Sequence, residues 1–323
     1  MLVLARRKPH KLEVCEALMR RGILPESNRE ALEDFYLRQS IGYDGECIAD
    51  NYWKDLRLNI PYVLLHSFET THRNMFHHQI DTLFVCKHFL LIVELKYIAG
   101  ELSYNIEFNQ FWRNHGGQQL TLGDPFAQLS RHELLMSHYL MEIGLDIPII
   151  TAVIVTAKSA FLNEMPNHFH IFKIEGLGLK LKSWLEKFPE VISNEEVIRI
   201  SSFLMSRFNP RRWDWKRVFP NITYQKGVLC SSCNKRMDYM NGRFICKCGN
   251  KLKSAMYEAL NDYRILSNEW ISNRELREYL GIVSPNTANK ILKKVSGAYI
   301  GDNRGRKYLL SKDILTNKIK KFK

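Results

Sequence analysis

Two apolar runs separated by a polar Lys-His pair make up the stretch Gln79–Gly100, QIDTLFVCKHFLLIVELKYIAG. Both runs are rich in β-branched and aromatic residues, and the pair between them is long enough for a tight turn, so the sequence predicts a β-hairpin. Asp81 interrupts the first predicted strand, and Glu94 and Lys96 interrupt the second. Because side chains alternate between the two faces of a strand, Glu94 and Lys96 lie on the same face. Ionised groups in such apolar strands are costly unless they are paired or bind a metal.

The segments around this hairpin predict a mixed α/β domain, with a central sheet flanked by helices. β-Branched runs predict further strands, and apolar residues at helical spacing predict helices. Residues 1–41 also have the pattern of amphipathic helices. The expected strands are Tyr62–Phe68, Pro148–Thr156 and His170–Ile174, and the expected helices are Gly45–Leu56 with Asp44 as its N-cap, Pro125–Met141 with proline in its first turn, and Leu179–Phe188.

The positive charge of the chain is concentrated in its C-terminal part. The net charge of the 323 residues is +13, but residues 1–204 contain 21 Lys and Arg against 25 Asp and Glu, whereas residues 205–323 contain 26 against 9. A polyanion such as nucleic acid is the simplest partner for such a surface, and a solvated basic surface is the alternative. No apolar run is long enough to span a bilayer, and the apolar start is too short for a signal peptide. We therefore expect a cytoplasmic protein that does not associate with membranes.

A carboxylate on one strand and a Glu-x-Lys pair on the next are residue types suited to metal-dependent cleavage of phosphodiesters. Asp81 and Glu94 can hold a hard divalent cation such as Mg²⁺ or Mn²⁺ through oxygen. The cation would polarise the phosphate and acidify a bound water, while Lys96 orients that water or neutralises developing charge. A Glu-x-Lys pair also occurs by chance, and the alternative interpretation is a salt bridge at the edge of a sheet.

Three histidines and three isolated cysteines are other potential metal ligands, but we expect them to have structural roles. Nitrogen is a poorer ligand than oxygen for a hard cation, so we expect turn or surface positions for the three histidines that precede the first strand carboxylate. Isolated thiols on apolar faces usually act as small core residues. These residues are His72, His77 and His78, and Cys15, Cys47 and Cys86.

Four motifs in a fixed order resemble a known family. They are Gly42-x-x-Gly45-Glu46, Gln79-Ile80-Asp81, Val93-Glu94-Leu95-Lys96 with Gly100 shortly after, and Asp124-Pro125-x-x-Gln128. The region from roughly Leu37 to Ile154 thereby resembles the nuclease-related domain (NERD), a branch of the PD-(D/E)xK restriction-endonuclease-like fold. One residue departs from the pattern, because Asp124 stands where the family usually has Asn before the proline.

The resemblance implies a nuclease-like domain and assigns roles to five residues. Asp81 and Glu94 would be the metal ligands, and Lys96 would be the catalytic lysine. Glu46 would be an added acidic ligand or would anchor a metal-bound water, and Gln128 would be a helix residue that faces the site. The predicted domain spans residues 37–206, preceded by an N-terminal helical region at 1–36 and followed by a basic linker at 207–223.

Four cysteines in the pattern C-x2-C…C-x-C predict a metal site in residues 224–252. Two short knuckles separated by a small hairpin bring four thiolates into the tetrahedron that structural Zn²⁺ prefers, and the segment looks like a zinc ribbon. Two disulfides fit neither the expected compartment nor a C-x-C pair. The ligands would be Cys230, Cys233, Cys246 and Cys248. The side chains around them that can grip a phosphate backbone or stack on a base are Lys226, Lys235, Arg236, Tyr239, Arg243, Phe244, Lys247 and Lys251.

Residues 254–311 have the pattern of a winged helix-turn-helix, and residues 312–323 form a lysine-rich tail that is frayed or bound to a polyanion. A helix over Asn273–Leu280 ends at Gly281, and Ser284-Pro285 begins a second helix that runs to Val295. A hairpin over Tyr299–Leu310 would be the wing. The predicted nucleic-acid contacts are Asn286, Thr287, Asn289, Lys290 and Lys293 on the second helix, and Arg304, Arg306 and Lys307 on the wing.

Together these patterns predict a Mg²⁺-dependent deoxyribonuclease that binds DNA through a zinc ribbon and a helix-turn-helix. The alternative is a DNA-binding regulator, or a repair or processing adaptor, that retains the nuclease fold without cutting. For the zinc ribbon, the alternative is a purely structural staple between two domains.

Overall fold

The computed structural model describes residues 2–72 and 76–322, and the chain forms two compact units that are each built from two separate segments. The sheet unit comprises Met1–Pro9 and Arg38–Arg212. The helical unit comprises His10–Leu37 and Trp213–Lys323. Each unit therefore depends on residues that are far apart in the sequence.

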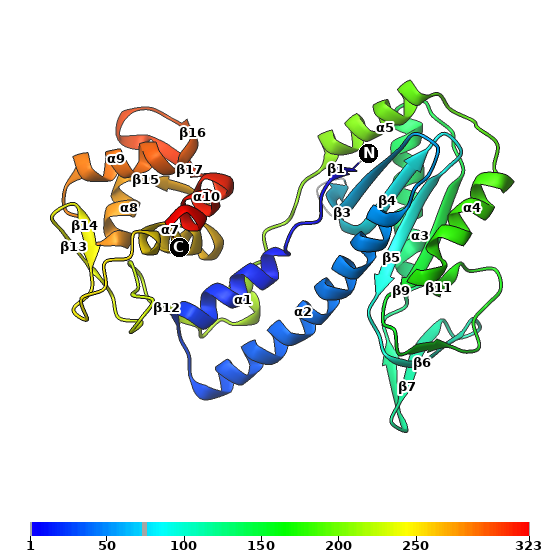
Figure 1. Ribbon diagram of the computed structural model, residues 1–323, viewed down its shortest axis with the longest axis horizontal. Helices are drawn as coiled ribbons and strands as arrows, with labels where there is room; N and C mark the ends of the chain where they lie inside the picture. Colours follow the sequence, from blue (N-terminus) through cyan, green and yellow to red (C-terminus); the bar gives the residue numbers. More distant parts are fainter. Residues whose placement is uncertain (1, 73–75, 323) are drawn as a thin grey trace. The chain divides into compact units, whose positions relative to one another are not determined.

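A mixed six-stranded sheet is the centre of the sheet unit, as the sequence predicts (Figure 1). Its strand order is β1-β3-β4-β5-β9-β11. The pairs β3/β4 and β4/β5 are antiparallel, and the pairs β1/β3, β5/β9 and β9/β11 are parallel. The predicted hairpin is confirmed as β4 and β5. The strands are β1 (Leu2–Leu4), β3 (Tyr62–His72), β4 (Phe76–Cys86), β5 (Leu90–Lys96), β9 (Ile149–Val155) and β11 (Ile171–Lys173).

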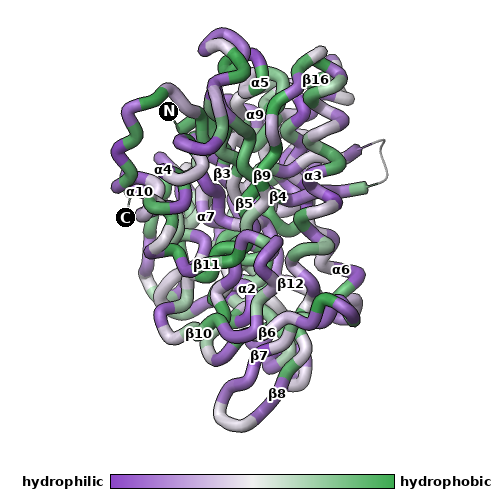
Figure 2. The backbone as a smooth tube through the Cα atoms, turned by 90° about the vertical axis from the view of Figure 1, so that its right-hand side faces the viewer, coloured by the Kyte–Doolittle hydropathy of each residue, from purple (hydrophilic) through white to green (hydrophobic). Residues whose placement is uncertain are grey.

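Helices cover both faces of this sheet because its strands are apolar on both sides (Figure 1). Leu83 and Val85 of β4 pack in one core with α3 and α5, whereas Phe84 packs in the other core with α2 and α4. Figure 2 shows the run of apolar residues along β9 that contributes to both cores. The helices are α2 (Glu26–Asp55), α3 (Pro125–Glu142), α4 (Leu177–Lys187) and α5 (Asn194–Arg207), with a 3-10 turn η1 at Ile174–Gly176.

The helix α2 corrects one expectation from the sequence. Asp44 is not an N-cap, because α2 begins at Glu26 and continues through Gly42 and Gly45. Gly45 lies against β5: a Cβ atom at this position would come within 2.3 Å of the Cβ atom of Tyr97. The glycine therefore permits close packing of the helix on the strand and does not mark a helix boundary.

A second sheet of the unit was not predicted. Its order is β10-β6-β7-β8, and Gly116-Gly117, both with positive φ, form the tight turn between β7 and β8. Strands β7 and β8 are mostly polar and exposed, so they lack the apolar pattern that identified the central sheet. They are β6 (Gly100–Asn105), β7 (Gln110–His115), β8 (Gln118–Leu122) and β10 (Ala160–Leu162).

The helical unit begins with elements from both ends of the chain. Leu18 of α1 and Leu32 of α2 share a core with Trp215 and Ile265. The buried guanidinium of Arg21 donates to Asp262 over 2.5 Å. The elements are α1 (His10–Arg21), β2 (Gly22–Ile23), α6 (Trp215–Val218) and β12 (Thr223–Tyr224), with β2 and β12 paired antiparallel.

The rest of this unit has the predicted ribbon hairpin and winged helix. The wing sheet has the order β15-β17-β16, and α8 and α9 lie between β15 and β16 in the sequence. Ser284 caps α9 by accepting from the Thr287 N–H, and Pro285 is in its first turn, as expected. The elements are β13 (Asp238–Met240), β14 (Arg243–Ile245), α7 (Ser254–Leu266), β15 (Trp270–Ser272), α8 (Asn273–Leu280), α9 (Pro285–Val295), β16 (Ser296–Ile300), η2 (Asn303–Gly305), β17 (Lys307–Leu310) and α10 (Lys312–Phe322).

The lysine-rich end is ordered, contrary to the expectation of fraying. Residues 312–322 form α10, whose Leu315 is fully buried. The ring of Phe322 stacks on Tyr257 of α7 with centroids 5.9 Å apart. Apolar residues at helical spacing within the basic segment account for this packing.

Candidate functional site

The two strand carboxylates lie opposite each other in the central sheet. Thr82 of β4 pairs with Val93 of β5, and extending this antiparallel register by one residue places Asp81 opposite Glu94. The side chain of Asp81 accepts from the Leu95 N–H through Oδ2 over 2.7 Å. Both residues are more than nine-tenths buried, with 8% and 4% of their surface exposed. The hairpin thus holds two acidic groups in an apolar sheet.

Two predicted residues bind the carboxylate of Glu94 from opposite sides. The Nζ atom of Lys96 lies 2.6 Å from Oε1, and the Nε2 atom of Gln128 donates to Oε2 over 2.7 Å. Lys96 follows Glu94 on the same strand face, whereas Gln128 is on the first turns of α3. Asp124 caps this helix by accepting from the N–H groups of Phe126 and Ala127. Because Asp and Asn are comparable N-caps, the departure from the family pattern at this position preserves the cap.

Arg6 is a residue of the site that sequence reasoning missed. Its guanidinium donates to Glu46 over 2.6 Å, to both oxygens of Asp50 over 3.0 Å, and to the main-chain oxygen of Asp81 over 3.1 Å. Its side chain is only 2% exposed. Glu46 therefore faces the acidic region from α2, but its carboxylate is held by an internal cation. The Arg6-Arg7 pair directly after the apolar run of residues 2–5 was the available signal.

Burial and mutual repulsion weaken the acidity of these carboxyl groups. Burial, together with the charge of Asp81, raises the pKa of Glu94 to about 8 and that of Glu46 to about 8. Burial also raises the pKa of Asp81, against the hydrogen bond from the Leu95 N–H and the charges of Arg6 and Lys96. Groups that repel one another in this way have a strong affinity for a cation, which relieves the repulsion.

The donor chemistry of the centre fits a hard divalent cation. Asp81 and Glu94 supply oxygen atoms from adjacent strands, which is the ligand type that Mg²⁺ and Mn²⁺ prefer. Glu46 adds a third carboxyl group, and the structure leaves it bonded to Arg6. Within residues 2–72 and 76–322, Glu46, Asp81 and Glu94 are not gathered as tightly as the four cysteines described below.

The three histidines lie in strands, with His72 at the end of β3 and His77 and His78 near the start of β4, and each contacts a neighbouring side chain. The Nε2 atom of His77 is 3.2 Å from Glu69, and the Nδ1 atom of His78 is 3.2 Å from that of His132 on α3. The ring of His72 lies edge-on to His138 with centroids 5.1 Å apart. All three histidines are half-buried in strands, so the expectation of turn or surface positions is wrong. Among the isolated cysteines, Cys15 and Cys86 are buried and Cys47 is half-buried.

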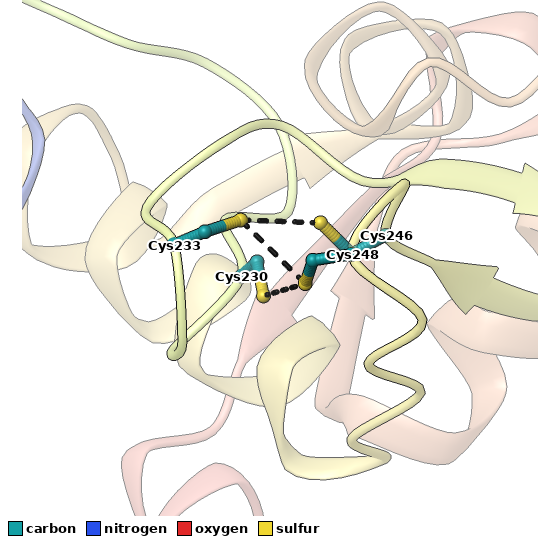
Figure 3. A group of neighbouring side chains, drawn as sticks. All are labelled: Cys230, Cys233, Cys246 and Cys248. Atoms are coloured by element: carbon teal, nitrogen blue, oxygen red, sulfur yellow. Dashed lines mark hydrogen bonds between the residues drawn. The ribbon is translucent and has the colours of Figure 1, made fainter.

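The four predicted cysteines form a compact cluster in the helical unit (Figure 3). The Sγ separations are 3.6 Å for Cys230 and Cys248, 3.4 Å for Cys233 and Cys246, and 3.7 Å for Cys233 and Cys248. Tetrahedral zinc with bonds of about 2.3 Å has ligand atoms about 3.8 Å apart. The cluster is therefore consistent with a structural zinc site. Asn250 and the Ser232 N–H both donate to Cys230, and such partners orient metal ligands.

Most predicted nucleic-acid contacts of the winged helix lie on the surface. The exposed members of this set are Asn286, Asn289, Lys290, Lys293 and Lys307. Thr287 is half-buried at the start of α9, and Asn289 accepts from Asn273 over 2.6 Å. Arg306 lies over the ring of Tyr299 at 4.6 Å. The side chain of Arg304 lies outside the part that the structure describes.

The basic residues of the ribbon are also exposed, but one of its two aromatic residues is not. Phe244 is 6% exposed and packs edge-on against Tyr239, with ring centroids 5.0 Å apart. The expectation that Phe244 stacks on a base is therefore wrong, because the ring fills the ribbon core. The exposed basic side chains are those of Lys226, Lys235, Arg236, Arg243, Lys247 and Lys251.

The fold and the acidic centre place the sheet unit among α/β domains with buried carboxylates on adjacent strands. Residues 41–156 match the family model described as the nuclease-related domain, NERD. This segment includes Glu46, Asp81, Glu94, Lys96 and Gln128. Arg6 lies outside it. Comparisons with curated proteins and with solved structures gave no match.

Over the described ranges, every helix is too short or too polar to cross a bilayer.

Proposed function

We propose that the protein is a divalent-metal-dependent nuclease that hydrolyses DNA phosphodiester bonds at the acidic centre of the sheet unit. The observation that carries the proposal is the pairing of Asp81 and Glu94 across β4 and β5, with Lys96 bonded to Glu94. The match of residues 41–156 to a nuclease-related family supports the same reaction class.

The residues of the acidic centre have different roles in hydrolysis. A bound Mg²⁺ ion supplies polarisation of the phosphate and a more acidic water. Asp81 and Glu94 would hold it through their oxygen atoms, and Gln128 keeps the Glu94 carboxylate in place through a 2.7 Å hydrogen bond. Lys96 brings a positive charge next to the phosphate, where charge develops as the new bond from the water oxygen forms and the P–O bond to the leaving oxygen breaks.

The helical unit supports a nucleic-acid substrate. Its exposed basic residues lie on the ribbon and on α9, and the net charge of residues 205–323 is strongly positive. Contacts between lysine or arginine and phosphates supply most of the sequence-independent affinity for DNA. We propose that the zinc ribbon and the winged helix bind the DNA that the acidic centre cleaves.

Cleavage assays with matched variants test the proposal. Wild-type protein is expected to cut DNA with Mg²⁺ or Mn²⁺ and to stop when these ions are omitted. Asp81→Asn, Glu94→Gln and Lys96→Met are expected to lower the rate by about a thousandfold, or ~4 kcal/mol. Glu190→Gln is the control, because Glu190 pairs with Lys87 at the turn of the same hairpin. Full activity in any of the three site variants would contradict the mechanism.

A second candidate function is a DNA-binding regulator or adaptor that does not cut. The observation that favours it is the 2.6 Å salt bridge between Arg6 and Glu46, which occupies one of the predicted acidic groups with a protein cation. Wild-type protein that binds DNA but is inert with Mg²⁺ and Mn²⁺ on single strands, duplexes and RNA would favour this function over the first.

A further inference from the structure

A pocket of about 420 Å³ lies beside the acidic centre. Lys96 and Gln128, the two residues bonded to Glu94, form part of its wall. The volume falls within the range of pockets that hold small organic ligands. The remaining lining residues are Ile98, Leu122, Gly123, Asp124, Ala127 and Arg131.

The pocket combines an apolar surface with cationic groups. Ile98, Leu122 and Ala127 supply the apolar part, and Lys96 and Arg131 supply positive charge. Its one carboxylate, Asp124, already accepts from two N–H groups of α3 and from the Tyr104 hydroxyl, at distances of 2.8, 3.2 and 3.2 Å. An anion at the pocket therefore meets cations and one carboxylate whose charge is offset by three hydrogen-bond donors.

Arg131 is placed to bind such an anion. It is exposed and lies on α3, one turn beyond Gln128, so both side chains reach the same side of the helix. Burial lowers the pKa of its neighbour His78, and burial lowers that of His132 to about 4. Both rings are then neutral at pH 7, so they carry no positive charge that attracts a phosphate away from Arg131.

We propose that this pocket holds one unpaired nucleotide next to the phosphodiester bond that is cleaved, with Arg131 binding its phosphate. The proposal rests on the proposed nuclease function and specifies its substrate. The sugar and base of a nucleotide have the apolar faces that the wall of Ile98, Leu122 and Ala127 can cover. A base that enters the pocket must leave its stack, which costs a few kcal/mol in a duplex and much less in a single strand or a frayed end.

Binding and cleavage measured on the same full-length variants test the proposal. Fluorescein-labelled tetrathymidylate is the binding probe, with Ca²⁺ replacing Mg²⁺ so that the strand remains intact. Arg131→Ala is expected to weaken binding about fivefold to tenfold and to reduce the salt dependence by about one phosphate contact. Arg57→Ala is the control, since Arg57 is exposed in the same unit but does not line the pocket.

A pocket-filling variant examines the base directly. Ala127→Leu narrows the pocket, so it is expected to slow cleavage of a single strand at least tenfold, while an abasic residue next to the cleaved bond restores much of the rate. Ser130→Leu is the control, because Ser130 is exposed on the same helix outside the pocket. Equal effects of Ala127→Leu on intact and abasic strands would overturn the assignment of a base to this pocket.

The two arms separate this inference from the nuclease proposal. If Arg131→Ala weakens tetrathymidylate binding in a protein that never cuts, the phosphate site stands and the nuclease proposal fails. If the wild type cuts DNA but Arg131→Ala binds the probe like the wild type, the pocket assignment fails alone. Cleavage of fully paired duplex interiors as fast as single strands would also overturn the requirement for an unpaired nucleotide.

Discussion

The acidic centre of the sheet unit and the cysteine cluster of the helical unit are both sets of metal-ligand side chains, but they are stabilised differently. The carboxylates have internal partners: Arg6 binds Glu46, and Lys96 and Gln128 bind Glu94. The four thiols all lie within 4.8 Å of one another, and their other described partners are neutral N–H and amide groups. The first set can fold around protein cations, whereas the second, as a structural zinc site, would need an external cation to neutralise four thiolates.

Zinc removal is therefore expected to give the largest difference between the two units, because it should unfold the cysteine cluster and leave the acidic centre folded. Cys246→Ser, or a zinc-selective chelator, is expected to unfold residues 228–252, because zinc binding of about 10–16 kcal/mol in small sites is also folding energy. Hydrogen exchange measured by mass spectrometry would show loss of protection in the ribbon and full protection in β4 and β5. Cys86→Ser is the control, since Cys86 is buried in the sheet unit outside the cluster. A ribbon that stays folded without zinc would show that the cysteine cluster, like the acidic centre, does not need an external cation to fold.

Removing Arg6, the internal cation, tests how the acidic centre is stabilised. Arg6→Met takes the cation away from the half-buried side chains of Glu46 and Asp50, so a loss of roughly 3 kcal/mol in the free energy of unfolding is expected above pH 8, where Glu46 is ionised. Arg7→Met is the matched control, because Arg7 is exposed and only lies over the Phe208 ring at 5.3 Å. Urea titration of both variants measures the difference.

The double variant Arg6→Met/Glu46→Gln identifies the charge responsible. It is expected to recover part of the lost stability, since the amide carries no charge that needs a cation. Equal stability of the two single arginine variants would show that the acidic centre does not depend on Arg6.

The raised pKa values predict that the stability of the metal-free protein depends on pH, with a smaller effect than the removal of zinc or Arg6. Glu46 and Glu94 have pKa values of about 8 in the folded state, against an ordinary value of 4.5. Between pH 7 and 8 the folded state therefore holds more protons than the unfolded state, and stability falls as the pH rises. The expected slope is about 1 kcal/mol per pH unit for each carboxyl group.

Thermal unfolding at several pH values measures this slope. Glu94→Gln is expected to flatten it, and Mg²⁺ is expected to offset it, because an ion that binds only the folded state stabilises that state. A slope that is unchanged in Glu94→Gln would assign the pH dependence to other groups.

Local patterns were sufficient to predict the hairpin, the cysteine cluster and the two helices of the winged domain. Each is encoded within a few tens of residues, by alternating apolar side chains or by fixed cysteine spacing. The role of Arg6 could not be derived in this way, because its contacts are with residues at positions 46, 50 and 81. Its pairing depends on a sheet that the local sequence around Arg6 does not specify.

The outer sheet and α2 show two other limits of sequence reasoning. Strands β7 and β8 have mostly exposed polar side chains, so hydrophobic periodicity does not identify them, although the Gly116-Gly117 turn was a usable indication. In α2, Gly45 resembled a helix boundary, yet its function is to let Tyr97 approach. The distinction requires knowledge of the neighbouring strand, which only the fold provides.

The division of the helical unit between two chain segments has a consequence for biosynthesis. Val14, Leu18 and Leu32 emerge from the ribosome early, but their partners Trp215 and Ile265 are translated only after the whole sheet unit. The apolar surface of these early residues therefore stays uncovered until the later residues have been translated. A shortened product that stops at residue 212 would keep that surface uncovered, which favours aggregation and degradation over release of an isolated sheet unit.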